Sequence, residues 1–223
     1  MCGASGEGRA GGDVLSKGRL LVACEYSATV RDAFARKGWE AWSCDLLPCE
    51  RAGETHLPDR HFQCDVRDVI GEQWDMMIAF PPCTDLCVSG ARWFKEKQAN
   101  GQQAQSIDFF MLFAKEHHIP RIAIENPVGI MSTLYRKPDQ VIQPWMFGHP
   151  EQKSTCLWLK NLPKLTPTND VKAEMMALPK NKRERLHYLP PSAGRWKERS
   201  RTFTGIAQAM ADQWSDVEEL TLL

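Results

Sequence analysis

Several features that define other classes of protein are missing from this chain. Its longest apolar runs are only as long as a β-strand, so no segment is long enough to cross a membrane as a helix. No pair of its eight cysteines has CxxC spacing and no histidine pair completes a zinc pattern, which disfavours a structural metal site. The first residues also lack the features of a signal peptide. We therefore expect free thiols in a reducing cytoplasm and no membrane partner.

The chain also has no net charge, but its charges are unevenly distributed. Residues 180–201 contain eight Lys or Arg and two acidic residues, a local charge of +6, so the rest of the chain carries −6. A local excess of this kind is typical of a segment that contacts an anionic partner. A solvated surface is the alternative interpretation, and the sequence leaves it open.

Short apolar runs alternate with helical patterns from residue 19 onward. Strands are predicted at 19–24, 40–44, 75–80, 121–125 and 155–159, with a weaker candidate at 61–64. Helical patterns cover 29–37, 103–117 and 205–214. Nearly continuous apolar strands separated by helices predict an α/β fold with a doubly wound, mostly parallel sheet. Its ligands should bind beyond the carboxyl ends of the strands.

The other segments set the predicted domain organisation. Residues 1–18 are rich in glycine and small residues and predict a flexible leader. Residues 19–160 form the predicted catalytic and cofactor-binding core, for which a chain of 223 residues is long enough. The Pro-rich basic segment 161–201 is expected to be an irregular, recognition-like insertion. Residues 202–223 are expected to return to the core as a helix with a short acidic tail.

Two polar side chains follow strong strands at the expected ligand-binding edge. Cys83 comes after the strand at 75–80, and the two prolines before it fix the direction in which the thiol leaves the sheet. Glu125 and Asn126 end the strand that begins at residue 121. If these strands are neighbours, the thiol and the carboxyl group face one pocket. A single cysteine is more commonly a small buried hydrophobe, which is our interpretation of Cys24, Cys44, Cys64 and Cys156.

The order of these residues resembles the cytosine-5 DNA methyltransferase family. That family has Pro-Cys in a loop after a strand and Glu-Asn-Val at the end of the next catalytic strand. This chain has Pro82-Cys83 and Glu125-Asn126-Pro127. The second motif differs from that of the family only in its last residue, and it retains the carboxylate and the amide. The resemblance runs from Leu20 to Trp214 in motif order and is closest to short, phage-encoded members. It implies the Rossmann-like fold of S-adenosylmethionine-dependent methyltransferases.

The resemblance also implies a covalent mechanism. Cys83 would add to carbon 6 of cytosine while Glu125 protonates N3, so that carbon 5 becomes nucleophilic enough to attack a methyl group. Loss of the carbon 5 proton would then release the thiol. Because Glu125 must be protonated when the base binds, we expect burial to raise its pKa. Asn126 and Lys153 complete the implied catalytic set, although Lys153 is equally consistent with a solvated surface lysine.

The cofactor implied by the resemblance is S-adenosylmethionine, or a modified form of it. The family's glycine-rich first loop is here a loop without glycine, whose backbone N–H groups we expect to bind the cofactor's carboxylate at a helix N-terminus. Asp45 and Asp65 end the second and third strands, where acids would bind the ribose hydroxyls and the adenine amino group. The implied cofactor-binding residues are Glu25, Tyr26, Ser27, Ala28, Thr29, Asp45, Asp65, Pro81 and Thr202.

DNA, double- or single-stranded, is the implied partner. The family's large recognition domain is replaced by about forty residues between Leu159 and Arg201, which can hold few base-reading side chains. We therefore expect mainly phosphate contacts, a short or degenerate target and, on duplex DNA, a flipped cytosine. Trp93 could fill the vacated space, and Trp196 and Tyr188 could stack on a base. The candidate nucleic-acid-binding residues are Arg92, Lys182, Arg183, Arg185, Arg195, Arg199 and Arg201.

Three alternatives stay open at this point. The same chemistry could act on RNA or on a free cytidine nucleotide, because the recognition segment is so short. The altered first loop could accept a donor that carries a group other than methyl. The chain could also be a catalytically idle nucleic-acid-binding module that kept the fold.

Overall fold

A computed structural model of the chain describes residues 16–53 and 57–216, so most of the predicted leader and the acidic tail lie outside the described residues. The described part contains one seven-stranded sheet with the order β3-β2-β1-β4-β5-β7-β6. Strand β7 is antiparallel to β5 and β6, and all pairs from β3 to β5 are parallel. The strands are β1 (Arg19–Ala23), β2 (Glu40–Asp45), β3 (His61–Gln63), β4 (Met76–Ala79), β5 (Arg121–Pro127), β6 (Gln140–Ile142) and β7 (Thr155–Lys160).

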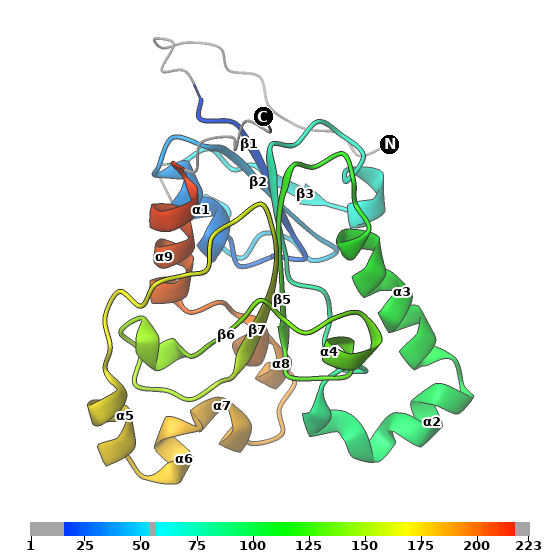
Figure 1. The fold of residues 1–223 in the computed structure, drawn as a ribbon, viewed down its shortest axis with the longest axis vertical. Coiled ribbons are helices and arrows are strands. Elements are labelled where there is room, and N and C mark those ends of the chain that lie inside the picture. Colours follow the sequence, from blue (N-terminus) through cyan, green and yellow to red (C-terminus); the bar gives the residue numbers. More distant parts are fainter. Residues whose placement is uncertain (1–15, 54–56, 217–223) are drawn as a thin grey trace.

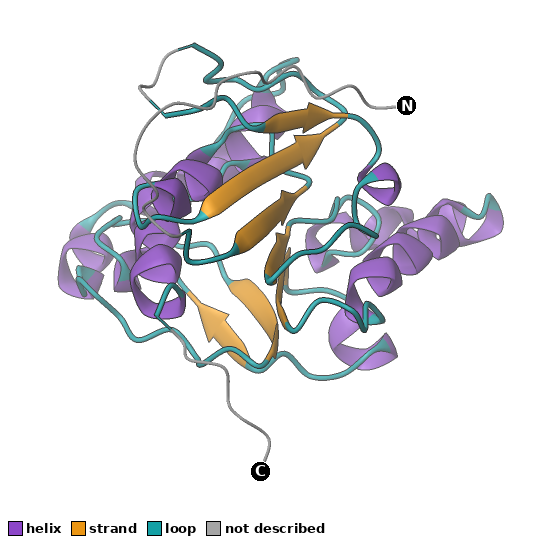
Figure 2. Cartoon of the chain, turned by 90° about the horizontal axis from the view of Figure 1, so that it is seen from above, coloured by secondary structure: helices purple, strands orange, loops and turns teal. Residues whose placement is uncertain are grey.

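Helices cover both faces of this sheet (Figures 1 and 2). Alternation along β1 explains why, since successive side chains of a strand point to opposite faces. Leu20 packs in one apolar cluster with Phe34 of α1 (Thr29–Ala35) and Trp214 of α9 (Thr204–Trp214). Leu21 packs in the other cluster with Phe110 of α3 (Gln102–Ala114). The sheet is thus a mostly parallel, doubly wound and Rossmann-like α/β sheet, as the sequence predicted.

Shorter helices surround the carboxyl ends of the strands (Figure 1). Two 3-10 turns, η1 (Val66–Asp68) and η2 (Val88–Trp93), follow β3 and β4, and a third, η3 (Pro144–Met146), follows β6. The remaining α-helices are α2 (Phe94–Ala99), α4 (Met131–Leu134), α5 (Lys172–Ala177), α6 (Lys180–Arg183), α7 (Arg185–Tyr188) and α8 (Arg195–Ser200). None of the described helices has the length and apolar character needed to cross a membrane.

The structure departs from the sequence-based expectation at several places, and the short helices α2 and α4 are among the elements that were not predicted. Residues 161–201 were expected to be irregular, but they contain four short helices. Strand β6, which pairs with β7, was not predicted. Residues 16–18 were assigned to the leader, but Lys17 N–H donates to Gly38 O at 3.1 Å and Ser16 Oγ accepts from Glu40 N–H at 3.2 Å. The chain therefore joins the fold slightly earlier than predicted.

Candidate active site

The ends of β4 and β5 bring Cys83 and Glu125 to one edge of the sheet. The two strands are parallel neighbours, with Ala79 paired to Ile124. The Cys83 thiol is half-buried, and its ionisation is affected by the charges of Glu125 and Lys153. Lys153 precedes β7, which pairs with β5 on its other side. Three of the residues named from the sequence are thus close enough to interact, although they come from three separate segments.

The loop that carries Cys83, residues 81–90, is held by contacts on both sides of the thiol. Asn126 is 2% exposed and donates from Nδ2 to Pro81 O at 2.8 Å. Beyond Cys83, the backbone between residues 86 and 88 is hydrogen-bonded to residues 128–130. The two segments approach so closely that a Cβ on Gly129 would lie 2.2 Å from Leu86 O. These contacts hold the backbone on both sides of Cys83, and Asn126 takes part in holding it.

Glu125 lines a small cavity. Burial raises the pKa of Glu125, while the charge of Lys153 and a hydrogen bond with Thr155 lower it. The cavity volume is about 10 Å³, which is room for about one water molecule. Thr202, which was predicted as a cofactor contact, also lines this cavity and so lies near Glu125. The other lining residues are Phe80, Ser200, Phe203, Ile206 and Met210.

Helix α8 lies over this cavity and over the loop that follows β1. Lys153 Nζ donates to Arg199 O at 3.1 Å. Tyr26 OH donates to Lys197 O at 2.9 Å and lies 3.2 Å from Ser200 Oγ. Arg201 forms an ion pair with Glu50. The end of the basic segment is therefore attached to both the predicted cofactor loop and the predicted base pocket, which the sequence did not indicate.

Glu25 occupies the N-terminus of α1. Its carboxyl group is 4% exposed and accepts hydrogen bonds from the N–H groups of Val30 at 2.7 Å and Arg31 at 3.2 Å. Burial raises the pKa of Glu25 to about 7, against the opposing effect of these two hydrogen bonds. We expected the amides at this helix N-terminus to bind the cofactor's carboxylate. In the structure these two amides bind Glu25 instead, because the turn at Ala28, with φ 58°, folds the loop back onto the helix.

Asp45 and Asp65 lie at adjacent strand ends. The charges of both affect the thiol of Cys24, which places them around the end of β1. Asp45 Oδ1 accepts from Leu47 N–H at 2.9 Å, and burial raises the pKa of Asp45. Asp65 Oδ1 accepts from Arg67 N–H at 2.9 Å, and Asp65 Oδ2 pairs with Arg67 Nη1 at 2.8 Å. Both carboxylates thus lie where the sequence placed them, at the carboxyl ends of β2 and β3, and their contact with a cofactor stays a prediction.

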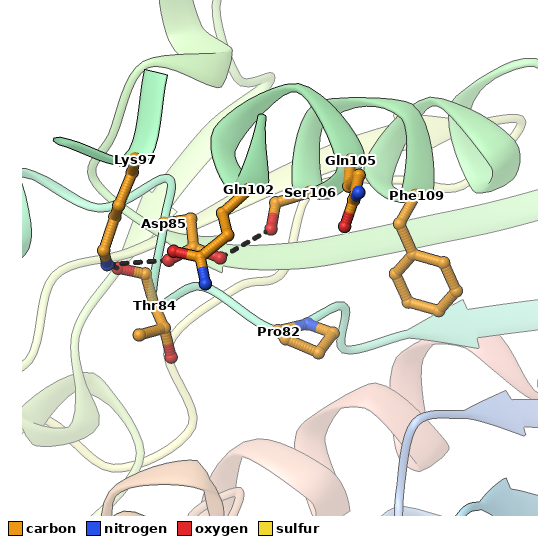
Figure 3. A pocket seen from close by; sticks show the side chains of 8 residues that line it. All are labelled: Pro82, Thr84, Asp85, Lys97, Gln102, Gln105, Ser106 and Phe109. Carbon is orange, nitrogen blue, oxygen red and sulfur yellow. Dashed lines mark hydrogen bonds and ion pairs between the residues drawn. The ribbon is translucent and has the colours of Figure 1, made fainter. Parts of the chain in front are cut away.

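A larger cavity of about 420 Å³ lies beside the Cys83 loop and was not predicted (Figure 3). Asp85 projects toward it and binds both Lys97 Nζ, at 2.7 Å, and Ser106 Oγ, at 2.8 Å. Phe109 lies at its other end, with the guanidinium group of Arg67 4.9 Å above the ring. The other residues that line this cavity are Pro82, Thr84, Gln102 and Gln105. The spacing of residues 102, 105, 106 and 109 on one face of α3 is the sequence signal for this wall.

The predicted nucleic-acid-binding residues lie on short helices around the same end of the sheet, except Arg201, which directly follows α8 (Figure 1). Arg92 lies 5.1 Å from the ring of Trp93, which is 49% exposed. Lys182 and Arg199 are exposed, whereas Arg183 and Arg195 are half-buried. Arg185 pairs with Glu151, and Arg195 donates to His187 O. Some of the basic side chains therefore hold the insertion together, and their contact with a nucleic acid stays a prediction.

Two comparisons of the sequence found no counterpart: no protein-family model matches, and no curated protein matches. Among solved structures, one match is a candidate DNA modification methyltransferase encoded within a prophage of E. coli. The identity is 17% and the TM-score 0.44, with 73% of this chain and 55% of that chain covered. This chain therefore spans about half the length of that protein. So distant a likeness carries no conclusion about activity.

Proposed function

We propose that the protein transfers a methyl group from S-adenosylmethionine to carbon 5 of a cytosine in DNA. The observation that supports this most is that a thiol, a carboxyl group and an ammonium group come together after β4, near the end of β5 and just before β7; they belong to Cys83, Glu125 and Lys153. Cytosine methylation at carbon 5 needs a nucleophile for carbon 6 and a proton donor for N3. Cys83 and Glu125 have the chemistry for these two tasks.

The residues around the end of β1 fit the proposed cofactor. Asp45 and Asp65 offer carboxylate oxygens that can accept hydrogen bonds from ribose hydroxyls and from an amino group. Tyr26, which is 6% exposed, lies in the loop that follows β1. S-adenosylmethionine would supply an electrophilic methyl group. No group of three or more His, Cys, Asp or Glu side chains in residues 16–53 and 57–216 is arranged to hold a metal ion.

In the proposed reaction, the Cys83 sulfur forms a bond to carbon 6 while Glu125 donates its proton to N3. The raised pKa of Glu125 supports this role, because burial keeps the carboxyl group protonated at a higher pH. Once the proton has left, the ammonium group of Lys153 stabilises the carboxylate that forms. After methyl transfer, the carbon 5 proton passes to solvent, the bond between carbon 6 and Cys83 breaks, and the N3 proton returns to Glu125.

Transfer of a labelled methyl group to cytosine-containing DNA tests the proposal directly. The variant Cys83→Ser should lose turnover and keep its fold and cofactor affinity, because a hydroxyl is far less ionised at neutral pH. The matched control is Cys49→Ser, which changes a half-buried cysteine in a loop after β2. Turnover by Cys83→Ser within about tenfold of wild type would exclude a covalent role for the thiol. Wild type should also form a denaturation-resistant adduct with DNA containing 5-fluorocytosine.

The same assay separates the possible substrates. Duplex DNA, single-stranded DNA, transfer RNA and a free cytidine nucleotide should be compared, because the helices of the recognition segment have only four to six residues each. Mass spectrometry of nucleosides from cells that express the wild type or Cys83→Ala identifies both the base and the group transferred. No modified cytosine in any of these substrates would favour the idle binding module.

A further inference from the structure

The cavity that Glu125 lines, which is the base pocket of the proposed reaction, is too small for a base. Its volume is about 10 Å³, whereas pockets that hold small molecules usually have roughly 300–1,000 Å³. Glu125 and Thr155 line it from β5 and β7. Ser200, the last residue of α8, and Thr202 line it as well. A pyrimidine can enter only if some of these residues move.

The residues of α8 are the part of the lining that can move. Strands β5 and β7 are paired along their length, so they cannot separate without breaking the sheet. Helix α9 is fixed at its start, where Gly205 N–H donates to His149 Nε2 at 2.9 Å and a Cβ on Gly205 would collide with Phe147 O. Helix α8, in contrast, has no buried residue. Elements with so few buried contacts open at a low cost in free energy.

Tyr26 attaches the α8 segment, residues 195–202, to the core. Its hydroxyl donates to Lys197 O at 2.9 Å and lies 3.2 Å from Ser200 Oγ. Its ring centroid lies 6.0 Å from that of Trp196. Tyr26 itself is 6% exposed, whereas Trp196 is 50% exposed. A side chain that is fixed in the core thus holds a segment that lies on the surface.

The α8 segment is also attached through charges that a phosphate group could replace. Arg201 forms ion pairs with Glu50 and Glu198, and both carboxyl groups are partly exposed. The segment has a net charge of +3 from Arg195, Lys197, Glu198, Arg199 and Arg201. Arginine binds phosphate as well as carboxylate through two parallel hydrogen bonds. The phosphates of a nucleic acid can therefore compete with Glu50 for Arg201.

We propose that the α8 segment is a lid that admits the target base to the base pocket, and that Tyr26 is the positioning residue that holds this lid closed. The inference rests on the function proposed above. In the closed form, Ser200 and Thr202 occupy space that the base needs. When the hydrogen bond between Tyr26 and the lid breaks, these two residues leave with the lid and the pocket gains room.

Opening of the lid also changes the surroundings of the catalytic residues. In the closed form Lys153 Nζ donates to Arg199 O at 3.1 Å. Once the lid has moved, this donor position of the ammonium group is free for Glu125 or for the base. The pairing of Arg201 with a phosphate in place of Glu50 favours the open form. The substrate therefore opens the lid with its backbone and fills the pocket with its base.

Hydrogen exchange of the free protein measures how often the lid opens. A detached helix of six residues is not stable by itself, so lid amides such as Arg201 N–H, which donates to Lys197 O, exchange on opening. Tyr26→Phe keeps the ring and removes the hydroxyl. We expect it to speed exchange of the lid amides about two- to tenfold, the effect of one ordinary hydrogen bond. Glu50→Ala should act in the same direction.

The affinity for nucleic acid distinguishes a lid from a purely structural role of Tyr26. If only the open form takes up the base, a variant that opens more often binds its substrate more tightly by the same factor. Without cofactor, Tyr26→Phe should bind a single-stranded oligonucleotide with one cytosine about two- to tenfold more tightly than wild type. The gain should be smaller for the same oligonucleotide with thymine in place of cytosine. A residue that only supports the fold would give weaker or unchanged binding.

Tyr135→Phe is the matched control and should change neither measurement, because the Tyr135 ring contacts Phe110 on the other face of the sheet. The inference is wrong if Tyr26→Phe and Glu50→Ala both keep the wild-type exchange rate while thermal unfolding shows that they are folded. It is also wrong if exchange accelerates and the affinity for the cytosine oligonucleotide stays the same or falls. If Tyr26→Phe shows both expected changes and wild type transfers no methyl group, the proposed function fails and the lid stands.

Discussion

The buried carboxyl group of Glu25 gives a prediction whose size follows from the structure. Glu25 is 4% exposed, and burial raises its pKa from 4.5 to about 7. Between these two values the folded protein keeps a proton that the unfolded chain has released. Stability should therefore fall as pH rises through this window, since a folded state that binds more protons is favoured at low pH.

The size of the effect follows from the size of the shift. Each pKa unit corresponds to about 1.4 kcal/mol, so a shift from 4.5 to about 7 is worth on the order of 3 kcal/mol across the window. In Glu25→Gln the side chain stays neutral at every pH. The free energy of unfolding of the variant should therefore increase relative to that of wild type as pH rises. The difference between the two should change by up to about 3 kcal/mol between pH 4.5 and pH 8.

Urea denaturation followed by circular dichroism at several pH values in this range measures that difference. Glu174→Gln is the matched control, because Glu174 is an exposed glutamate on α5 and its replacement should leave the pH dependence of wild type unchanged. The reasoning is refuted if the difference between Glu25→Gln and wild type is the same at pH 4.5 and pH 8. A variant that loses stability relative to wild type as pH rises would refute it as well.

Other substitutions test the proposed reaction and its ligands. Glu125→Gln should lose the chemical step and keep cofactor affinity, as single-turnover kinetics and calorimetry would show, because an amide supplies no proton to N3. Asp45→Ala and Asp65→Ala should each weaken cofactor binding by about 1–3 kcal/mol in calorimetry, the usual loss for a charged hydrogen bond. Lys182→Ala and Arg199→Ala should each lower the logarithmic salt slope of nucleic-acid binding by about 0.7 to 0.9 and leave target preference unchanged.

Clear results would contradict each of these expectations. A wild-type rate in Glu125→Gln removes Glu125 from the mechanism. Wild-type cofactor affinity in both aspartate variants, matching that of the control Asp108→Ala on the exposed side of α3, means that the cofactor binds elsewhere. Nucleic-acid binding that does not depend on salt, or a long palindromic target in sequencing of modified cytosines, assigns recognition to another part of the chain.

The core of this fold was predictable because its signals are local. Continuous apolar runs predict strands buried on both faces, and prolines mark the strand ends that carry Cys83 and Glu125. The helices of the insertion have four to six residues, too few for a helical pattern to be recognised. Left-handed residues without a glycine, such as Ala28, carry no sequence signal that would have shown Glu25 folding back onto α1.

The contacts of α8 could not be predicted from the sequence because they join residues that are far apart in the chain. These contacts also have a thermodynamic consequence. Tyr26 and Lys197 are 171 residues apart, and Lys153 and Arg199 are 46 apart. Because one helix is bonded both to the loop after β1 and to Lys153, a ligand that displaces it on one side also changes the free energy of its contacts on the other. Linkage is reciprocal. If cofactor binding changes the affinity for nucleic acid by some factor, nucleic acid must change the affinity for cofactor by the same factor.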